Sequence, residues 1–402
     1  MELIRQNMRI LLLTFYYPPD LSAGSFRARA LEEALVKEAG RDLHIDVIST
    51  MPNRYHSMKW AADANEEHGN VTIRRIAIPE HKSGMADQAR AFGSFAFKVR
   101  RLAQNAKWDG VVATSSRLMT AALGARIARS KKIPLYLDIR DLFTDTMSDL
   151  LQGKALRSVL PAFSALEKWT LRSANRVNIV SPGFLPHVSR FLGEEKIRTF
   201  TNGIDDDFLN LDFSSERNDP VVIVYAGNMG EGQGLHRVVP EAACMLGSRA
   251  RFRLIGDGGR RKQLEDAIEK AGIDNVELLD PVPRQQLYAH YRDADYLLLH
   301  LNDHAAFHKV LPSKIFEYAA SGKPVLAGVS GCAAEFLQTE VQGSAVFAPC
   351  DPQGLVDAFE HLEGQKGFDR EMFKEKFARR LIMRDMARDI LKVMGQQRRR
   401  HG

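Results

Sequence analysis

The chain has 402 residues, of which 45% are hydrophobic and 26% charged, a composition typical of folded globular proteins and not of disordered ones. Its 56 lysines and arginines against 50 aspartates and glutamates give a net charge of +6; no nucleic-acid-binding signature accompanies that charge, and we expect no nucleic-acid partner. The length suits two or more domains, and the three cysteines, Cys244, Cys332 and Cys350, are too few and too scattered for a disulfide framework or a zinc cluster.

The N-terminal segment MELIRQNM (1–8) leads directly into a strand-like sequence and shows no features of a secretory signal peptide. The longest apolar runs, at 9–17 and 296–301, are far shorter than the roughly 20 residues that span a bilayer. We therefore expect a cytoplasmic protein that is at most peripheral at the inner face of the cell membrane.

Apolar segments of strand length alternate with helical segments, such as 25–39 and 260–272, through most of the chain. The strands expected in the first half are 8–17, 44–50, 71–78, 110–115, 133–141, 176–181 and 197–202. Those expected in the second half are 220–228, 250–258, 275–280, 294–301, 324–329 and 344–349. Strands that are apolar on both faces and alternate with helices predict parallel sheets covered by helices on both sides.

The polar segment DFSSERNDP (212–220) ends in a proline directly before a new strand and marks the expected domain boundary. We predict an α/β protein with two doubly wound, Rossmann-like domains, 1–212 and 213–375. Residues after about 365 are helical and rich in charge, with no strand left to pair. The segment 376–402 is therefore predicted to be a C-terminal helix with a basic tail.

Residues 84–108 combine five basic side chains and one acidic side chain with several aromatic ones, Phe92, Phe95 and Phe97 among them. One interpretation is an amphipathic helix whose apolar stripe packs in the core. The other is contact with an anionic membrane surface, where basic and aromatic residues act together. The tail QQRRRHG (396–402) forms a second basic cluster.

Ligands of open parallel sheets bind beyond the carboxyl ends of the strands, so the residues that follow strands are the candidates for a site. Gly24 follows the first strand, and glycine-rich sequences follow two later ones, YAGNMGEGQGL (225–235) and LIGDGG (254–259). None is a Walker loop or a strict dinucleotide fingerprint. Each fits either a phosphate site or an ordinary turn, and Asp257 is either a helix cap or a nucleotide contact.

The most informative segment is HKVLPSKIFEYAASGKPVLAG (308–328). Its proline fits the first turn of a helix, where exposed amides around Ser313 favour an anion and Lys314 adds a charge suited to phosphate. Glu317 lies one turn further on, where its carboxylate can accept two hydrogen bonds from ribose hydroxyls. Taken alone, an ordinary helix with a solvated lysine and glutamate explains this segment equally well.

Four of these features occur in an order and spacing that resemble the GT-B-fold glycosyltransferases of family 4. They are Gly24, NGID (202–205), GDG (256–258) and PSKIFEYAASGKPVLA (312–327). More narrowly, they look like bacterial sugar transferases of the WbuB type, which build O-antigen, capsule or exopolysaccharide units. The resemblance implies two Rossmann-like domains that face each other across a cleft, and a C-terminal helix that crosses back to the N-terminal domain.

The implied activity is a retaining transfer of a hexosyl or N-acetylhexosaminyl group from a nucleoside-diphosphate sugar, expected to be a UDP-sugar. The implied acceptor is lipid-linked or a saccharide, in the synthesis of cell-envelope polysaccharide such as lipopolysaccharide or exopolysaccharide. The resemblance implies no cofactor and no metal. An anionic membrane surface, met through 84–108 and the basic tail, is the further partner that we expect.

The resemblance also assigns residues. The expected donor-binding residues, from the motifs and the resemblance together, are Gly24, Gly227, Asn228, Gly256, Asp257, Lys309, Val310, Leu311, Ser313, Lys314 and Glu317. The expected catalytic residues are Asp138, Arg140 and Asp141, from LDIRDLF (137–143), which matches the strand end that carries a catalytic histidine in many relatives. An aspartate there can orient the acceptor hydroxyl or stabilise a cation-like transition state.

Several positions depart from the family pattern. Lys309 stands where the family has the first of two glutamates, Asn228 and Gln233 stand where it has a basic pair, and Arg140 stands at the histidine position. We expect Lys314, with Lys309, to supply the missing positive charge. These departures leave two alternatives open, a GT-B nucleotide-sugar epimerase and a non-catalytic partner that binds a nucleotide sugar and docks an active transferase.

His300, His304 and His308 recur every fourth residue, a spacing that can bind metal on a helix. The first of them ends an expected strand, and the glutamate of the zinc-protease motif is missing. Contacts to the donor and a plain loop are the other interpretations, and we expect no metal site here.

Overall fold

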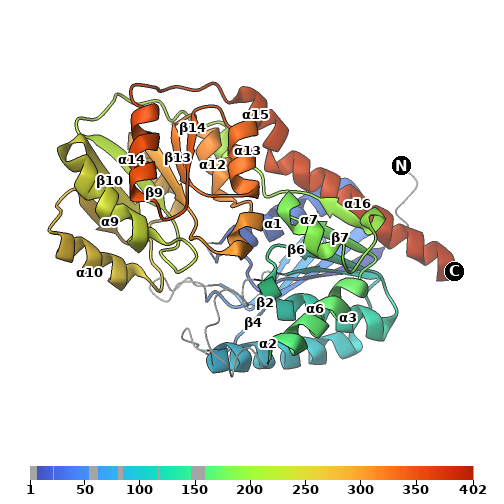
Figure 1. Ribbon diagram of the computed structural model, residues 1–402. Helices are drawn as coiled ribbons and strands as arrows, with labels where there is room; N and C mark the ends of the chain where they lie inside the picture. The colour runs from blue at the N-terminus through green and yellow to red at the C-terminus, as the bar shows by residue number, and fades with distance from the viewer. Residues whose placement is uncertain are drawn as a thin grey trace. The chain divides into compact units, whose positions relative to one another are not determined.

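The computed structural model describes residues 7–20, 22–53, 62–79, 85–115, 118–145 and 159–401, without the side chains of 85, 86 and 397–401. The chain divides into two compact units (Figure 1). The first joins Met1–Asn202 to Arg379–Gly402, and the second is Gly203–Ala378. Among the described helices, none combines the length and the apolar character needed to cross a membrane.

The first unit is built on a sheet that has eight strands in the described part of the chain, in the order β3-β4-β2-β1-β5-β6-β7-β8. The strands are β1 (Met8–Leu13), β2 (Leu43–Thr50), β3 (Asn65–His68), β4 (Val71–Ile76), β5 (Gly110–Thr114), β6 (Leu135–Ile139), β7 (Arg176–Ile179) and β8 (Ile197–Thr199). All neighbours pair in parallel except β3 and β4. The predicted doubly wound sheet is thereby confirmed.

The strand β3 was not predicted from the sequence, because its residues NEEH include no apolar residue that would indicate a strand. It pairs antiparallel with β4 at the edge of the sheet, with His68 opposite Val71. Charged, largely exposed side chains are typical of edge strands, since they discourage pairing with another chain.

Helices cover both faces of the first sheet. They are α1 (Ala23–Ala39), α2 (Met85–Asn105), α3 (Leu118–Lys131), α6 (Leu160–Arg172), α7 (Leu185–Val188) and α16 (Arg379–His401). Even-numbered residues of β1, such as Ile10 and Leu12, share one core with α1 and α16. Leu13, on the other face, lies close to α3 at Gly124. This alternation is what a strand buried on both sides requires.

The second unit has a six-stranded parallel sheet in the order β11-β10-β9-β12-β13-β14. Its strands are β9 (Val221–Ala226), β10 (Ala250–Ile255), β11 (Val276–Leu279), β12 (Tyr296–His300), β13 (Val325–Gly328) and β14 (Ser344–Phe347). Its helices are α8 (Asp206–Leu209), α9 (Leu235–Leu246), α10 (Arg261–Ala271), α11 (Arg284–Asp293), α12 (Lys314–Ala320), α13 (Cys332–Glu340), α14 (Pro352–His361) and α15 (Glu371–Phe377).

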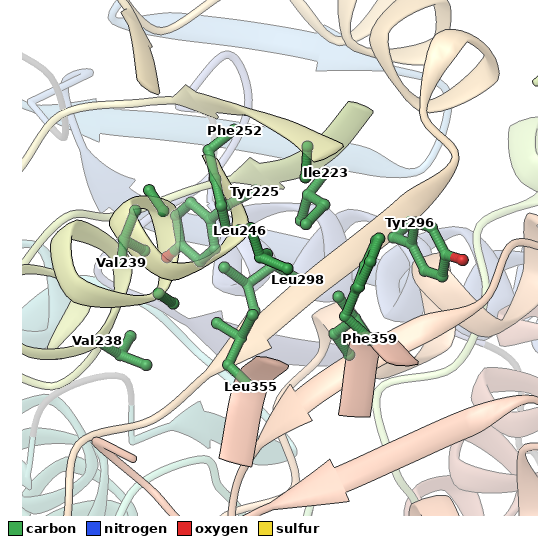
Figure 2. Packing of buried hydrophobic residues seen from close by; sticks show 14 of the residues in the cluster. Ile223, Tyr225, Val238, Val239, Leu246, Phe252, Tyr296, Leu298, Leu355 and Phe359 are labelled. Carbon is green, nitrogen blue, oxygen red and sulfur yellow. The ribbon is translucent and has the colours of Figure 1, made fainter. Parts of the chain in front are cut away.

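One face of this second sheet packs against α9, α10 and α14. Figure 2 shows the centre of the resulting core, where Leu298 of β12 lies among side chains of the helices and Phe359 of α14 lies beside Tyr296. The rings of Tyr296 and Phe359 are 5.2 Å apart. Burial of these side chains fixes the strands whose ends carry the candidate site.

The domain boundaries differ from the predicted ones, which were 212/213 and 375/376. The chain passes into the second unit after Asn202, so the polar segment 212–220 lies inside that unit. The reason is α8, which belongs to the core of the second unit: the Phe208 ring stacks on Phe213 at 5.7 Å and meets Tyr288 edge-on at 4.9 Å. At the other end, the chain returns to the first unit at Arg379.

We predict that Ile390→Ala, in the fully buried face of α16, destabilises the first unit by roughly 2–5 kcal/mol, because it leaves a cavity against α1. Urea unfolding followed by tryptophan fluorescence measures this, because all three tryptophans, Trp60, Trp108 and Trp169, belong to the first unit. The control is the exposed Lys392→Ala, with a change below about 0.5 kcal/mol. Equal stability of the two variants would contradict the packing of α16.

Candidate active site

The strand order of the second sheet reverses between β9 and β12, which are neighbours in the sheet but not in the sequence. In open parallel sheets a ligand binds at such a point, beyond the carboxyl ends of the strands. The loop 227–234 follows β9 and the loop 301–313 follows β12, and Asn302 N donates a hydrogen bond to Gly232 O at 2.9 Å. The two candidate loops thus lie side by side.

Glycine is required where the loops after β9 and β10 meet. Gly227 and Gly256 have φ values of 149° and 148°, which side chains rarely adopt. A methyl group on Gly256 would lie 1.8 Å from the carbonyl oxygen of Gly227. The glycine-rich sequences are therefore fixed by close backbone approach, and this approach leaves the ends of β9 and β10 without side-chain bulk.

Lys314, the first residue of α12, lies against this glycine loop. A methyl group on Gly227 would stand 3.1 Å from its Cε and 3.4 Å from its Nζ. Its ammonium lies 5.5 Å from the centre of the Tyr318 ring. Burial lowers the pKa of Lys314, while the nearby Glu317 acts to raise it. The structure thus brings Lys314 and Gly227 together, as a phosphate site would require.

Tyr318 fixes the position of α12 relative to the sheet. Tyr318 is fully buried, and its hydroxyl accepts a hydrogen bond from the backbone N–H of Ala226 at 3.2 Å. Because Ala226 is the last residue of β9, this bond ties the first turns of α12 to the strand end. Lys314 and Glu317 are therefore carried on an element that is fixed to the sheet.

Arg284, the first residue of α11, is a charged residue of this site that was not predicted from the sequence. Burial opposes its charge, but Asp205 and Glu317 raise its pKa above the ordinary value for arginine. It forms an ion pair with Asp205, and its guanidinium lies 5.4 Å from the ring centre of Phe208. Asp205 belongs to the NGID segment, and this motif was the one sequence signal close to Arg284. Arg284 places a fixed positive charge near Glu317.

Asn228 and Gln233, which stand where the family has a basic pair, hydrogen bond to each other. Asn228 Nδ2 donates to Gln233 Oε1 at 2.6 Å, and the same oxygen accepts from Gly230 N at 3.3 Å. Tyr225 donates its hydroxyl proton to the carbonyl oxygen of Asn228 at 2.6 Å. Neutral side chains thus close this loop on itself, and the positive charge next to the loop comes from Lys314 of α12.

The remaining expected donor-binding residues lie on the same edge of the sheet. Lys309 ends a 3-10 turn over Ala305–Lys309, and Val310 N donates to Phe307 O at 3.1 Å. Leu311 is 2% exposed, so it offers a ligand only its backbone. Ser313 directly precedes α12 and makes no side-chain capping bond.

Asp257 does not cap the helix that follows it, so this interpretation of the sequence is wrong. The cap residue of α10 is Arg260, and the Asp257 carboxylate accepts a hydrogen bond from Gly258 N at 2.7 Å. Asp257 is exposed at the carboxyl end of β10, beside Gly256.

The three histidines do not converge. His300 donates through Nδ1 to Gln233 O at 2.5 Å and accepts at Nε2 from Cys350 N at 2.9 Å, which fixes a neutral ring. His308 lies 3.5 Å from Asp303, and His304 packs edge-on against Phe307. Among the described residues, no group of three histidine, cysteine, aspartate or glutamate side chains could hold a metal ion.

In the first unit, Asp138 lies in the interior. Its carboxylate accepts from Arg27 Nε at 2.8 Å, from Arg27 Nη2 at 3.0 Å and from Asn178 Nδ2 at 2.7 Å. Burial acts to raise the pKa of Asp138, but Arg27 outweighs it and holds the pKa below the ordinary value. Asp138 is 0% exposed and its carboxylate is held by Arg27 and Asn178, so the structure shows a structural role for it; its catalytic role stays a prediction.

Arg140 and Asp141 directly follow β6 at the carboxyl edge of the first sheet. Arg140 is held by its backbone, whose N–H donates to Ser115 Oγ at 3.0 Å. In the described part of the chain, its Nε and Nη1 are buried and have no hydrogen-bond partner. Burial and Arg27 lower its pKa to about 10, so the guanidinium remains charged at neutral pH. Asp141, beside it, is exposed.

Gly24 lies in the first turn of α1, as the sequence predicts for a helix that starts directly after the first strand and its loop. Ser22 caps this helix and accepts a hydrogen bond from Ser25 N at 3.2 Å. The Ser25 hydroxyl is buried and has no hydrogen-bond partner within the described residues. Gly24 and Arg140 thus lie at the same, carboxyl edge of the first sheet.

Comparison with known proteins identifies both units as domains of a glycosyltransferase of the GT-B fold, an enzyme that transfers sugars. The family model "Glycosyl transferase 4-like domain" matches residues 25–203, and "Glycosyl transferases group 1" matches residues 207–380. The chain belongs to glycosyltransferase family 4.

Individual relatives support this assignment. WcaI of Escherichia coli (strain K12), named as a colanic acid biosynthesis glycosyl transferase, is 24% identical over 341 residues, which are 78% of this chain and 82% of WcaI. WaaG, a glycosyltransferase involved in lipopolysaccharide biosynthesis, has the same fold with a TM-score of 0.63 at 15% identity, over 97% of this chain and 98% of WaaG. HepE of Anabaena, solved with UDP-glucose, matches with a TM-score of 0.60 at 16% identity, over 97% and 98% of the two chains.

Because His300 is buried, we predict that the protein loses stability in acid. Burial lowers its pKa to about 4, against about 6.5 in the unfolded chain. Its contribution is therefore complete above pH 6.5 and is lost as the pH falls toward 4, by up to about 3 kcal/mol. We expect His300→Gln to lose less stability than the wild type between pH 7 and pH 4.5, in urea unfolding followed by circular dichroism.

The matched control is His361→Gln, at the exposed end of α14, which should keep the wild-type pH profile. An unchanged pH dependence in His300→Gln would show that the neutral, buried ring is not what acid disrupts.

Proposed function

We propose that this glycosyltransferase takes its sugar from a nucleoside-diphosphate donor, a UDP-sugar, which binds at the carboxyl edge of the second sheet. The observation that carries the proposal is the contact of Lys314 with the glycine loop at Gly227, with Glu317 one turn further along α12. A diphosphate suits the ammonium and the bulk-free loop, and a ribose suits the carboxylate. HepE, which has the same fold, was solved with UDP-glucose.

The chemistry follows from the charge that builds up on the leaving diphosphate. Lys314 is partly desolvated, so its charge acts more strongly on a phosphate oxygen than it would in water. In this proposal the cation takes the place that a metal ion holds in other transferases, and the reaction needs no metal. The sugar is transferred with retention of configuration, in keeping with the family.

The acceptor is proposed to meet the first unit, at the edge that carries Arg140 and Asp141. Arg140 brings a charged guanidinium whose Nε and Nη1 are buried and have no hydrogen-bond partner among the described residues, and the exposed carboxylate of Asp141 lies next to it in the chain. A guanidinium there stabilises negative charge, and a carboxylate orients a hydroxyl group. We propose that the acceptor is a lipid-linked saccharide of cell-envelope polysaccharide synthesis, since WcaI and WaaG are named for colanic acid and lipopolysaccharide.

The test separates donor binding from transfer. We expect Lys314→Ala and Glu317→Ala to weaken UDP binding roughly tenfold or more in calorimetry, because each removes a charge-assisted contact. The affinity of the wild type should not change when EDTA is added. Arg140→Gln should keep the UDP affinity but lose roughly a hundredfold in transfer of radiolabelled sugar to an organic-extractable product.

The control for donor binding is Lys270→Ala, an exposed lysine near the end of α10. Unchanged UDP affinity in Glu317→Ala would contradict the proposal that Glu317 binds the ribose. Release of a free sugar epimer, with no acceptor needed, would support an epimerase instead.

We further propose that the enzyme works in the cytoplasm, peripherally at the membrane, through α2. Phe92, Phe95 and Val99 of this helix are buried in the first unit, as the core interpretation of 84–108 predicts. Phe97, however, is 70% exposed, and the exposed Arg101 lies one turn away on the same side of the helix. An exposed phenylalanine among arginines suits an anionic bilayer. The side chains of the basic tail, Arg398–Arg400, lie outside the described residues.

We expect Phe97→Ser to weaken binding to vesicles of phosphatidylcholine and phosphatidylglycerol about tenfold, because a buried aromatic side chain is lost from the bilayer. The double variant Arg100→Gln, Arg101→Gln should weaken it by a similar factor or more, and salt should weaken the wild type. Arg129→Gln, an exposed arginine on α3, is the control. Equal sedimentation of all four proteins with the vesicles would contradict a role of α2.

A further inference from the structure

The second unit has a cleft of about 780 Å³ that is separate from the candidate donor site. Its wall includes Tyr296, at the start of β12, and Lys323 and Pro324, directly before β13. These residues mark the amino edge of the sheet, whereas the donor loops follow the carboxyl ends of the same strands. The cleft is therefore on the opposite edge of the sheet from Lys314.

Arg370, in the wall of this cleft, is a buried cation whose hydrogen bonds are incomplete. It is 4% exposed, and its Nε donates to the carbonyl oxygen of Ala319 at 3.2 Å. Its two terminal nitrogens, Nη1 and Nη2, have no hydrogen-bond partner in the described part of the chain. A charged group whose buried donors have no acceptors lowers the stability of the folded protein. An acceptor from outside the chain would remove this penalty for Arg370.

The carboxylates of the cleft do not meet this need, because each is engaged elsewhere. Asp295 accepts from the backbone N–H and the side chain of Asn218 and from Val222 N. Both oxygens of Asp212 accept from Ser214.

The two acidic residues next to Arg370 in the sequence are also engaged. Glu371 pairs with Lys374 at 2.9 Å, and Asp369 accepts from Glu371 N at 2.9 Å. Burial lowers the pKa of Arg370 and the nearby Asp369 acts to raise it, but in the described part of the chain no carboxylate accepts a hydrogen bond from Nη1 or Nη2.

Burial lowers the pKa of Lys323, a second cation of the wall, and the nearby Asp295, Asp293 and Asp212 act to raise it, but its hydrogen bonds go to neutral groups. Lys323 is 9% exposed, and its Nζ donates to Ser215 Oγ at 2.7 Å and to Arg292 O at 2.8 Å, both of which are neutral oxygens. The exposed Lys366 adds a third positive charge at the rim. Three cations of the wall are thus held by neutral groups or by none.

We propose that this cleft binds a small oxyanion, a phosphate or carboxylate group, with Arg370 as its main ligand and Lys366 at the rim. Guanidinium is well suited to such a group because two of its N–H groups can bind two oxygens side by side. The Phe368 ring stacks on the guanidinium, with 5.1 Å between its centre and Cζ. Since Nη1 and Nη2 lie below the surface, side chains of the wall must move as the anion enters. The flanking Gly364 and Gly367, with φ values of 80° and 68°, border that segment.

The experiment is equilibrium dialysis of the full chain with radiolabelled inorganic phosphate, and separately with citrate, while saturating UDP occupies the proposed donor site. We expect one anion to bind per chain and Arg370→Gln to weaken it roughly tenfold or more, with UDP affinity unchanged within about twofold. The control is Arg249→Gln, an arginine of the same unit whose exposed guanidinium pairs with Glu360 and Glu363.

A second variant covers the case in which Arg370→Gln does not fold, as judged by circular dichroism. Lys366→Glu changes only an exposed residue and should weaken anion binding roughly threefold or more. Binding of either anion that both variants weaken supports the site. No binding of phosphate or citrate, or binding that neither variant changes, overturns it. Failure of UDP to bind would count against the donor proposal alone, because the dialysis with phosphate still compares wild type and variants.

Discussion

The ion pair between Arg27 and Asp138 is the interaction to which most of the first unit is tied. Arg27 reaches the carboxylate through two nitrogens, and it also donates to the carbonyl oxygens of Thr201 at 2.6 Å and Phe200 at 2.9 Å. Its Nη2 lies 3.4 Å from the sulfur of Met386 in α16. One buried guanidinium thus connects α1, the end of β6, the segment after β8 and the last helix. Removal of one partner from such a pair leaves a buried charge, so all of these elements depend on it.

The second unit depends on a constraint of a different kind, which is the near contact of two backbones at Gly227 and Gly256. This near contact limits which groups can form the candidate site. Since no side chain fits between the ends of β9 and β10, the charged groups must come from elsewhere, and α12 supplies them. The buried Tyr318 then fixes the distance from that helix to the strand end. The neutral residues Asn228 and Gln233 agree with this arrangement, in which the loop contributes backbone and α12 contributes the charged side chains.

Much of the fold could be predicted from the sequence, because strands buried on both faces leave a strong pattern, as LLLTFYY and YLLLHL show. The strand β3 could not be, since an edge strand of charged residues has no such pattern. The domain boundary was also misplaced, because the packing of Phe208 against Tyr288 joins residues far apart in the chain.

The same difference between local and distant information applies to the site. Lys314 and Glu317 could be singled out because they share one short helix with a recognisable motif. The structural role of Asp138 was not visible, because its partners Arg27 and Asn178 are distant in sequence. Arg284 was missed for the same reason, although its partner Asp205 lies in a motif that had been noted. Long-range ion pairs between single residues leave no periodic signal.

The return of the chain to the first unit at Arg379 has a consequence for the order in which the protein is made on the ribosome. Met383, Met386 and Ile390 of α16 complete the core that α1 begins. These residues are translated only after every residue of the second unit has been added to the nascent chain. Domains generally fold as units during synthesis. The core of the first unit can therefore close only after the whole second unit has been synthesised, and until then the apolar side of α1 needs other protection from aggregation.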